Sequence, residues 1–164
     1  MQNRAMIIRH ILQTDNQYLA EIIRSTLAEF GANHPGTVYF DSSIDSLFEL
    51  FRKLGSVYYV VENEDGKIVG GGGIFPTEGL PPDTCELVKM YLIPEVRGTG
   101  LGKSIIEKCM HSAYGYGYRK VYMETMPELK LALKVYEKFG FHYLDHPIGN
   151  SGHFGCDLHM IREL

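Results

Sequence analysis

The middle of the chain reads Pro94-Glu95-Val96-Arg97-Gly98-Thr99-Gly100-Leu101-Gly102-Lys103-Ser104. This segment joins a predicted strand over residues 85–93 to a predicted helix over residues 100–114, whose apolar side chains recur at helical spacing. Glycines at alternate positions let the backbone turn tightly and leave several N–H groups beside the helix N-terminus. Such amides form a site for a phosphate or pyrophosphate. A tight turn without a ligand is the alternative that this segment alone leaves open.

Two common nucleotide-binding motifs do not fit the glycine-rich segment. Gly102, Lys103 and Ser104 look like the end of a P-loop, but that motif needs a glycine where this chain has Arg97. A dinucleotide-binding loop needs the spacing G-x-G-x-x-G within a βαβ unit. Here the spacing is G-x-G-x-G, and a predicted hairpin precedes it. We therefore expect an anion site of another kind.

The elements on either side of this segment predict a single α/β (α+β) domain over residues 6–164. Strands are expected over residues 6–12, 57–62, 68–75, 85–93, 119–125, 141–144 and 153–161, and helices over 14–30, 41–55, 100–114 and 127–140. The two strands around the Asp65-Gly66 turn form a β-hairpin. The run from Gly70 to Gly73 inside the second of these strands indicates a bulge or a close backbone neighbour.

Composition excludes several classes of protein. The chain has 164 residues and a net charge of −4, so a broad cationic surface for nucleic acid is not expected. Tyr114, Tyr116 and Tyr118 alternate with glycine, a pattern that fits packing of a helix end better than base stacking. No apolar run is long enough to cross a membrane. The three cysteines are an odd number and widely spaced, which favours a reducing, cytoplasmic compartment.

Two motifs resemble those of the GNAT N-acetyltransferases. Arg97-x-x-Gly100-x-Gly102, after a strand that ends Leu92-Ile93-Pro94, resembles the acetyl-CoA signature of that family. Ala132-Leu133-Lys134-Val135-Tyr136-Glu137-Lys138-Phe139-Gly140-Phe141 resembles its A-x-x-x-Y-E-K-x-G-F segment. The motifs stand in the family's order, with a helix and a strand between them. The resemblance covers residues 84–144 in motif detail.

This resemblance implies a fold, a cosubstrate and a binding site. The fold is a splayed mixed sheet of six to seven strands with about four helices, and acetyl-CoA lies where two parallel central strands part. Amides of residues 98–103 take the pyrophosphate, and the backbone of residues 90–92 pairs with the pantetheine arm. The acetyl-CoA residues implied in this way are Met90, Tyr91, Leu92, Arg97, Gly98, Thr99, Gly100, Leu101, Gly102 and Lys103.

Three residues are candidates for catalysis of acetyl transfer to an amine. Tyr136 matches the tyrosine that donates to the CoA sulfur in many members, and the alternative is a core aromatic. Glu124 has a spacing to Tyr136 that resembles the protein N-terminal acetyltransferases, and Glu86 has a position that resembles the histone-type members. A glutamate in an apolar strand is costly to bury unless it faces a cleft or a partner. Either can be the base, or a structural salt bridge.

Two features of the C-terminal part stay open. Leu129 stands where the family often has an asparagine, so a CoA contact through that amide must be absent or supplied otherwise. His142, His146, His153, Cys156 and His159 crowd the end of the chain. On one strand His153 and His159 would share a face and Cys156 would point away, so no metal site is expected. His146 or His153 could instead line an acceptor pocket.

Two classes of function compete. The first is an acetyl-CoA-dependent N-acetyltransferase that acts by direct attack of a primary amine on a small molecule or a protein. The second is a GNAT-like module that binds or senses acyl-CoA without turnover. The candidate catalytic residues favour the enzyme. The sequence identifies no acceptor, and a homodimer is compatible with it.

Overall fold

The computed structural model describes residues 5–164. Its strands are β1 (Ile7–His10), β2 (Val57–Glu62), β3 (Ile68–Phe75), β4 (Thr84–Leu92), β5 (Lys120–Thr125), β6 (His142–Leu144) and β7 (Leu158–Glu163). Its α-helices are α1 (Asn16–Glu29), α2 (Leu47–Leu50), α3 (Leu101–Gly115) and α4 (Lys130–Lys138), and short 3₁₀ turns are η1 (Gln13–Asp15), η2 (Val38–Phe40), η3 (Ser42–Ser46) and η4 (Pro94–Val96). Within these residues no helix is long and apolar enough to cross a membrane.

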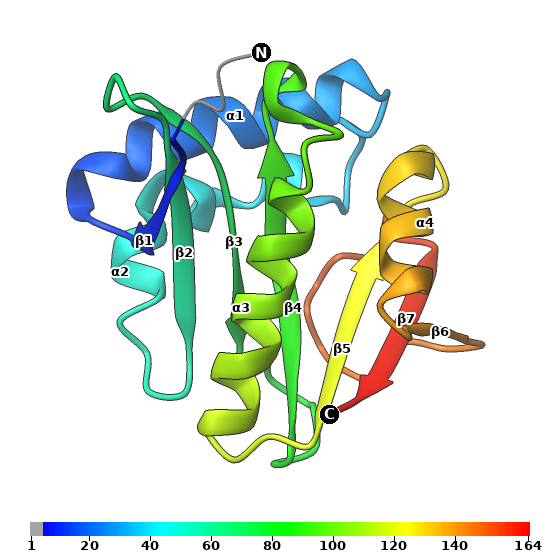
Figure 1. Cartoon of the computed structure of the whole chain (residues 1–164). Coiled ribbons are helices and arrows are strands. Elements are labelled where there is room, and N and C mark those ends of the chain that lie inside the picture. The colour runs from blue at the N-terminus through cyan, green and yellow to red at the C-terminus, as the bar shows by residue number, and fades with distance from the viewer. Residues whose placement is uncertain (1–4) are drawn as a thin grey trace.

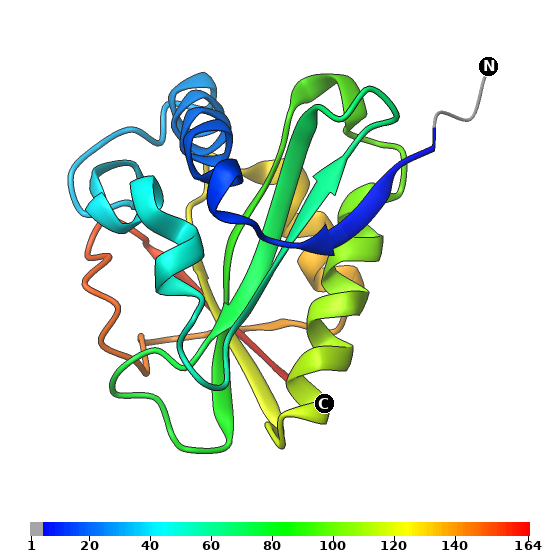
Figure 2. The same cartoon turned by 90° about the vertical axis from the view of Figure 1, so that its left-hand side faces the viewer.

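All seven strands form one mixed sheet in the order β1-β2-β3-β4-β5-β7-β6. Helices cover both of its faces: α3 and α4 lie on one side, and α1 and α2 on the other (Figures 1 and 2). The apolar residues accordingly form two clusters. One packs β-sheet side chains against α3 and α4, and the other packs them against α1 and the η3–α2 segment. The expected α/β fold with a mixed sheet is confirmed.

The sheet opens between its two parallel strands. β4 and β5 pair only at Thr84–Lys120, Cys85–Val121 and Glu86–Tyr122, although both strands continue beyond these pairs. Figure 1 shows them diverging from that end. Every other pair of neighbouring strands is antiparallel. The part of β4 after Glu86 therefore has a free edge toward β5, and the gap is open to side chains from both faces.

A bulge in β4 bends that strand away from β5. The β3–β4 register shifts between Gly71 and Gly73, and Lys89 on the opposite strand has a φ of 53°. Close neighbours explain the glycines of β3: a Cβ at Gly71 would lie 2.6 Å from the Tyr58 ring, and one at Gly73 would lie 2.4 Å from the Val57 carbonyl oxygen. Both features that the glycine run indicates, a bulge and a close neighbour, are present.

Three expected elements differ in the structure. The helix expected after Asp41 is divided into η3 and the four-residue α2, although Asp41 does cap η3 by accepting from the Ser43 amide. The fourth helix begins at Lys130 rather than at Pro127, because a turn from Met126 to Leu129 precedes it. The last strand begins at Leu158 rather than at residue 153. Residues 153–157 are loop, so the strand-face argument about His153 and Cys156 was wrong.

Candidate active site

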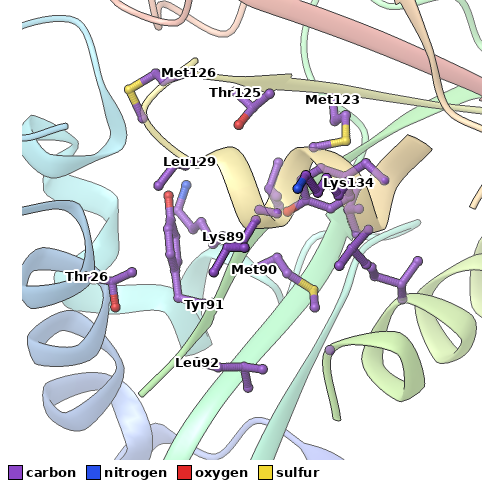
Figure 3. A pocket seen from close by; sticks show the side chains of 18 of the residues that line it. Thr26, Lys89, Met90, Tyr91, Leu92, Met123, Thr125, Met126, Leu129 and Lys134 are labelled. Atoms are coloured by element: carbon purple, nitrogen blue, oxygen red, sulfur yellow. The ribbon is translucent and has the colours of Figure 1, made fainter. Parts of the chain in front are cut away.

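A cavity of about 500 Å³ fills the opening between β4 and β5. The glycine-rich segment borders one end, and buried carboxylates border the other. Figure 3 shows Lys89, Met90, Tyr91 and Leu92 in succession along one wall, with Met123, Thr125 and Met126 and then Leu129 and Lys134 of the α4 region on the opposite side. Its volume lies within the usual range for a small-molecule site.

Most of the residues predicted to bind acetyl-CoA line this cavity. Those that do are Met90, Tyr91, Leu92, Arg97, Gly98, Gly100, Gly102 and Lys103. Thr99 and Leu101 do not line it. The Thr99 hydroxyl donates to the Val96 carbonyl at 2.7 Å, and Leu101, the first residue of α3, is buried in the core. Their side chains therefore shape the turn, and only their backbone groups are available to a ligand.

The backbone conformation before α3, rather than close packing, requires glycine at Gly98 and Gly100. Gly98 and Gly100 have φ values of +75° and +84°, where other residues are strained. A Cβ at either position would meet no atom within 4 Å in the described structure, so the surface of the turn is open. The helix begins with the bond from the Ser104 amide to the Gly100 carbonyl, at 3.1 Å. The amides before Ser104 precede the first intrahelical hydrogen bond, so they are the candidate anion site at this helix N-terminus.

The side chain of Arg97 makes structural contacts within the protein. Its Nε donates to the Leu92 carbonyl at 3.0 Å, and its two terminal nitrogens donate to the Glu29 carboxylate at 2.9 Å each. The guanidinium also lies 5.1 Å from the centre of the Phe30 ring. Arg97 therefore ties the glycine-rich segment to β4 and α1. Lys103, Lys134 and Lys138 also line the cavity, and Nζ of Lys103 lies 3.8 Å from the Glu107 carboxylate in an exposed pair.

Tyr136 points from α4 into the α3–α4 side of the opening. The residue is buried, lines the cavity, and packs edge-to-face on Phe141 with ring centres 6.1 Å apart. Its hydroxyl makes no hydrogen bond to any described residue. Burial raises the pKa of the Tyr136 phenol, so the group stays protonated at neutral pH. A neutral phenol without a protein partner is a donor available to a ligand.

Glu124 is held by its neighbours. Its side chain is 4% exposed. It accepts a hydrogen bond from the Tyr122 hydroxyl at 2.7 Å and another from the Ser151 hydroxyl. Nδ1 of His153 lies 3.9 Å from one carboxylate oxygen, and Nδ1 of His159 lies 3.7 Å from the other. Both oxygens of Glu124 are thus engaged by the protein.

Glu86 keeps one oxygen available. The residue is 3% exposed and lies at the last β4–β5 pair. Thr77 donates to Oε1 at 2.6 Å, whereas Oε2 has no partner among the described residues and the side chain lines the cavity. Burial raises the pKa of the Glu86 carboxyl to about 7; the Thr77 hydrogen bond opposes this rise and the charge of Glu124 adds to it. A carboxyl that titrates near neutral pH suits a general base.

The catalytic candidates lie on opposite faces of the opened sheet. Cys85, Leu87, Val121 and Met123 belong to the cluster with α3 and α4, as does Tyr136. Side chains alternate along a strand, so Glu86, Tyr122 and Glu124 face the side of α1 and η3. One face thus offers a carboxylate and the other offers a phenol. This arrangement can take a proton from a group entering on one face and donate to a group leaving on the other.

Sequence reasoning missed part of the carboxylate end. Asp41, expected only as a helix cap, has Oδ2 3.4 Å from Nζ of Lys89 and 3.3 Å from Nε2 of His153. These partners hold the pKa of Asp41 well below its usual range, with the His153 contact as the largest cause. His153 lines the cavity, as one of the open alternatives had it, whereas His146 is exposed and does not. The sequence feature that could have indicated these contacts is Lys89, a charged residue within an otherwise apolar strand.

The histidine and cysteine residues near the C-terminus do not gather around one point. His142 and His146 are exposed, whereas His153 and His159 both approach Glu124. Cys156 is buried and lines the cavity, and burial raises the pKa of its thiol to about 12. Across residues 5–164, no group of three such side chains is arranged to hold a metal ion.

Comparison with known proteins identifies the family. The model of the acetyltransferase (GNAT) family matches residues 19–141. The chain belongs to the GNAT acetyltransferase family. Membership makes it an acyltransferase of the N-acetyltransferase type, as the two sequence motifs implied. The match includes the glycine-rich segment and the whole of α4, whereas His153 and Cys156, which also line the cavity, follow the matched residues.

Individual GNAT proteins match over nearly the whole chain. The uncharacterized N-acetyltransferase YjgM of Escherichia coli K12 is 40% identical over 159 residues, which are 96% of this chain and 95% of YjgM. A GNAT acetyltransferase from Staphylococcus aureus Mu50 superposes with a TM-score of 0.87 at 20% identity, covering 98% of this chain and 99% of that one. The PaiA N-acetyltransferase of Thermoplasma acidophilum, solved in complex with coenzyme A, has a TM-score of 0.75 at 19% identity, with 98% and 99% covered.

Proposed function

We propose that this protein transfers the acetyl group of acetyl-CoA to a primary amine by direct attack. The observation that carries the proposal is the opening between β4 and β5, which has an anion site at one end and reactive groups on both faces at the other. The proposal places the protein in a reducing compartment such as the cytoplasm. Consistent with this, none of Cys85, Cys109 and Cys156 forms a disulfide.

The residues present fit acetyl-CoA. The amides of residues 98–103 suit the pyrophosphate, and Lys103, Lys134 and Lys138 add positive charge at that end. The free edge of β4 from Met90 to Leu92 offers backbone groups to the amides of the pantetheine arm. Leu129 lines the cavity where the family often has an asparagine, so the wall is apolar there. Backbone groups must then make the CoA contact that the asparagine amide would make.

The reaction needs one proton acceptor and one proton donor. The free amine attacks the thioester carbonyl carbon, the new C–N bond forms, and the C–S bond breaks. Glu86 is the better base of the two candidates, because it keeps an oxygen without a partner and titrates near neutral pH. The amine proton passes to Glu86, and Tyr136 donates its proton to the departing thiolate. Glu124 acts as a positioning residue through Tyr122 and Ser151.

A module that binds acyl-CoA without turnover is the second candidate. The two candidates differ in what they leave in solution, since only the enzyme releases free CoA when an amine is supplied. The buried Glu86 favours the enzyme: Thr77 binds one of its oxygens, and the side chain lines the cavity, where the other oxygen can accept a proton.

The test is an acceptor screen that follows free CoA. Purified protein is incubated with acetyl-CoA and separate pools of amino acids, simple amines, polyamines and peptides with a free N-terminus. Amine-dependent CoA release, with the acetylated product identified by mass spectrometry, supports the proposal. Tight acetyl-CoA binding with no release from any pool supports the sensor instead.

A further inference from the structure

The cavity contains a buried cation that acetyl transfer as described above does not use. Lys89 lines the cavity, and its side chain is only 5% exposed. Its ammonium carries three N–H donors, but the structure gives Nζ one partner, Asp41, at 3.4 Å. A buried ammonium with unfilled donors is costly unless an anion or another acceptor reaches it.

The backbone holds Lys89 in place at an energetic cost. Its φ of 53° is the one positive value among the described residues other than glycine, and this left-handed conformation is unfavourable for a residue that carries a Cβ. The hydroxyl of the fully buried Tyr58 donates to the Lys89 carbonyl at 2.7 Å, which fixes the bulge. Backbone strain of this kind is concentrated at functional sites, where the direction of a side chain matters.

Asp41 is an incomplete partner for Lys89. Its Oδ1 is occupied by the Ser43 amide and hydroxyl, and its Oδ2 is shared between Lys89 and His153. The Asp41 side chain is also 25% exposed, so part of its charge is screened by solvent. Lys89 therefore keeps positive charge and hydrogen-bonding capacity facing the cavity.

The same cavity contains the free oxygen of Glu86. The charges of Lys89 and Glu86 act on each other, and that of Lys89 lowers the pKa of the Glu86 carboxyl. Lys89 follows Glu86 on β4, and its partner Asp41 also contacts His153, which lies beside Glu124. A group that binds both must offer an amine to Glu86 and an anion to Lys89.

Two loops enclose this end of the cavity. The amide of Gly155 donates to the Gly36 carbonyl at 2.8 Å, and a Cβ at Gly36 would lie 2.5 Å from the Gly155 nitrogen. The two loops also meet where His153 contacts Asp41. Val38, His153 and Cys156 bring both loops to the cavity wall. These contacts hold the two loops together beside Lys89.

We propose that the acceptor is an α-amino acid, or a compound with a carboxylate placed as in one, and that Lys89 binds that carboxylate while Glu86 receives the amine proton. This inference rests on the proposed N-acetyltransferase function and names its acceptor class. Lys89 then distinguishes amino acids from simple amines, from polyamines and from peptide N-termini, because these lack a carboxylate beside the amine.

The first experiment uses the unaltered protein and acceptors matched in side chain. For phenylalanine, methionine and leucine, kcat/KM is measured for the amino acid, for its α-amide and for the amine without the carboxyl group. A dipeptide and a diamine complete the panel. We expect the amino acid to exceed the other members by about 10²-fold or more, since a buried charge is otherwise left unpaired. Equal or better acetylation of the amides, amines, dipeptide or diamine overturns the inference but leaves N-acetyl transfer standing. Absence of acetylation throughout overturns both.

A second experiment changes Lys89. Lys89→Met keeps the length of the side chain and removes its charge, so kcat/KM for the amino acid should fall about 10²-fold while that for the matching amide changes little. Lys89→Arg should restore part of the preference. Lys67→Met, in an exposed turn outside the cavity, is the matched control. An equal loss for amino acid and amide contradicts the assignment of Lys89, and circular dichroism checks that each variant is folded.

Discussion

At the scale of single residues, the structure distinguishes Glu86 from Glu124, which the sequence leaves as alternative candidates for the base. Glu124 is engaged at both oxygens, whereas Glu86 has one free oxygen and a pKa raised to about 7 by burial. Tyr136 lies on the other face of the sheet with a protonated, unpartnered hydroxyl. Glu86 and Tyr136 therefore have distinct expected effects when they are changed.

Glu86→Gln removes the proposed base without changing its size. We expect kcat/KM to fall by about 10²- to 10⁴-fold, the usual contribution of general acid–base catalysis. In the unaltered enzyme, kcat/KM should rise with pH through an acidic limb near 7, and this limb should be missing in the variant. Profiles of kcat/KM against pH measure both. An unchanged acidic limb in Glu86→Gln contradicts its role as the base.

Glu86 also predicts how stability depends on pH. Its pKa is 4.5 in an ordinary environment and about 7 in the folded protein, so the folded state holds a proton that the unfolded state loses between these values. The Glu86 contribution to the free energy of unfolding is therefore fully present below pH 4.5 and is lost as the pH rises through 7. The loss is on the order of 3 kcal/mol. Urea unfolding should show Glu86→Gln to be more stable than the unaltered protein at pH 8 and similar at pH 4.5. A less stable variant at pH 8 is the contrary result.

Tyr136→Phe tests the proposed proton donor. Because the ring and its contact with Phe141 remain, folding and acetyl-CoA affinity should be unchanged. The rate constant kcat should fall by about 10²-fold or more, since the thiolate then leaves without a donor. Steady-state kinetics and calorimetry separate these quantities. A variant that keeps the original kcat shows that Tyr136 serves only as a core aromatic.

At the scale of elements, the glycine-rich segment and the N-terminus of α3 are the proposed anion site. Gly100→Glu should abolish acetyl-CoA binding, because a carboxylate and its carbons would occupy the surface of the turn at the helix N-terminus. Gly117→Glu is a matched control: Gly117 also has a positive φ and open space around its Cβ position, but it lies beyond the other end of α3. The backbone strain is then similar in both variants. Calorimetry that finds equal CoA affinity for both contradicts the assignment of the anion site.

At the scale of the whole molecule, contacts between distant loops enclose the acceptor end of the cavity. Gly36→Ala places a Cβ against the Gly155 backbone and adds the cost of a φ of +80°. Gly31→Ala, with a φ of +70° and no neighbour within 4 Å, carries the conformational cost alone. We expect losses of about 1 kcal/mol for Gly31→Ala and about 2–3 kcal/mol for Gly36→Ala.

A kinetic difference should accompany this loss of stability. Separation of the two loops in Gly36→Ala should raise the KM of the acceptor but not that of acetyl-CoA, because the glycine-rich segment lies at the other end of the cavity. Gly31→Ala should change neither constant. Equal stability of the two variants, or a rise in KM for acetyl-CoA alone, argues against the enclosing role of the loops.

The sequence by itself determined the order of elements and the family, and it indicated the candidate anion site, because each depends on local features. The glycine spacing sets the turn before α3, apolar periodicity sets the helices and strands, and the segment around Tyr136 carries the second motif. It did not determine the short elements after Asp41 or the start of β7, where packing outweighs local periodicity.

Tertiary structure alone decided how the candidate active site is arranged. The separation of β4 from β5 depends on a bulge that needs both β3 and β4. Glu86 and Glu124 are alike in sequence, but Thr77 binds one of them while Ser151 and Tyr122 bind the other. Asp41, Lys89 and His153 meet from three distant parts of the chain. Burial and hydrogen bonding set the protonation of these groups, and both arise only when distant segments pack together.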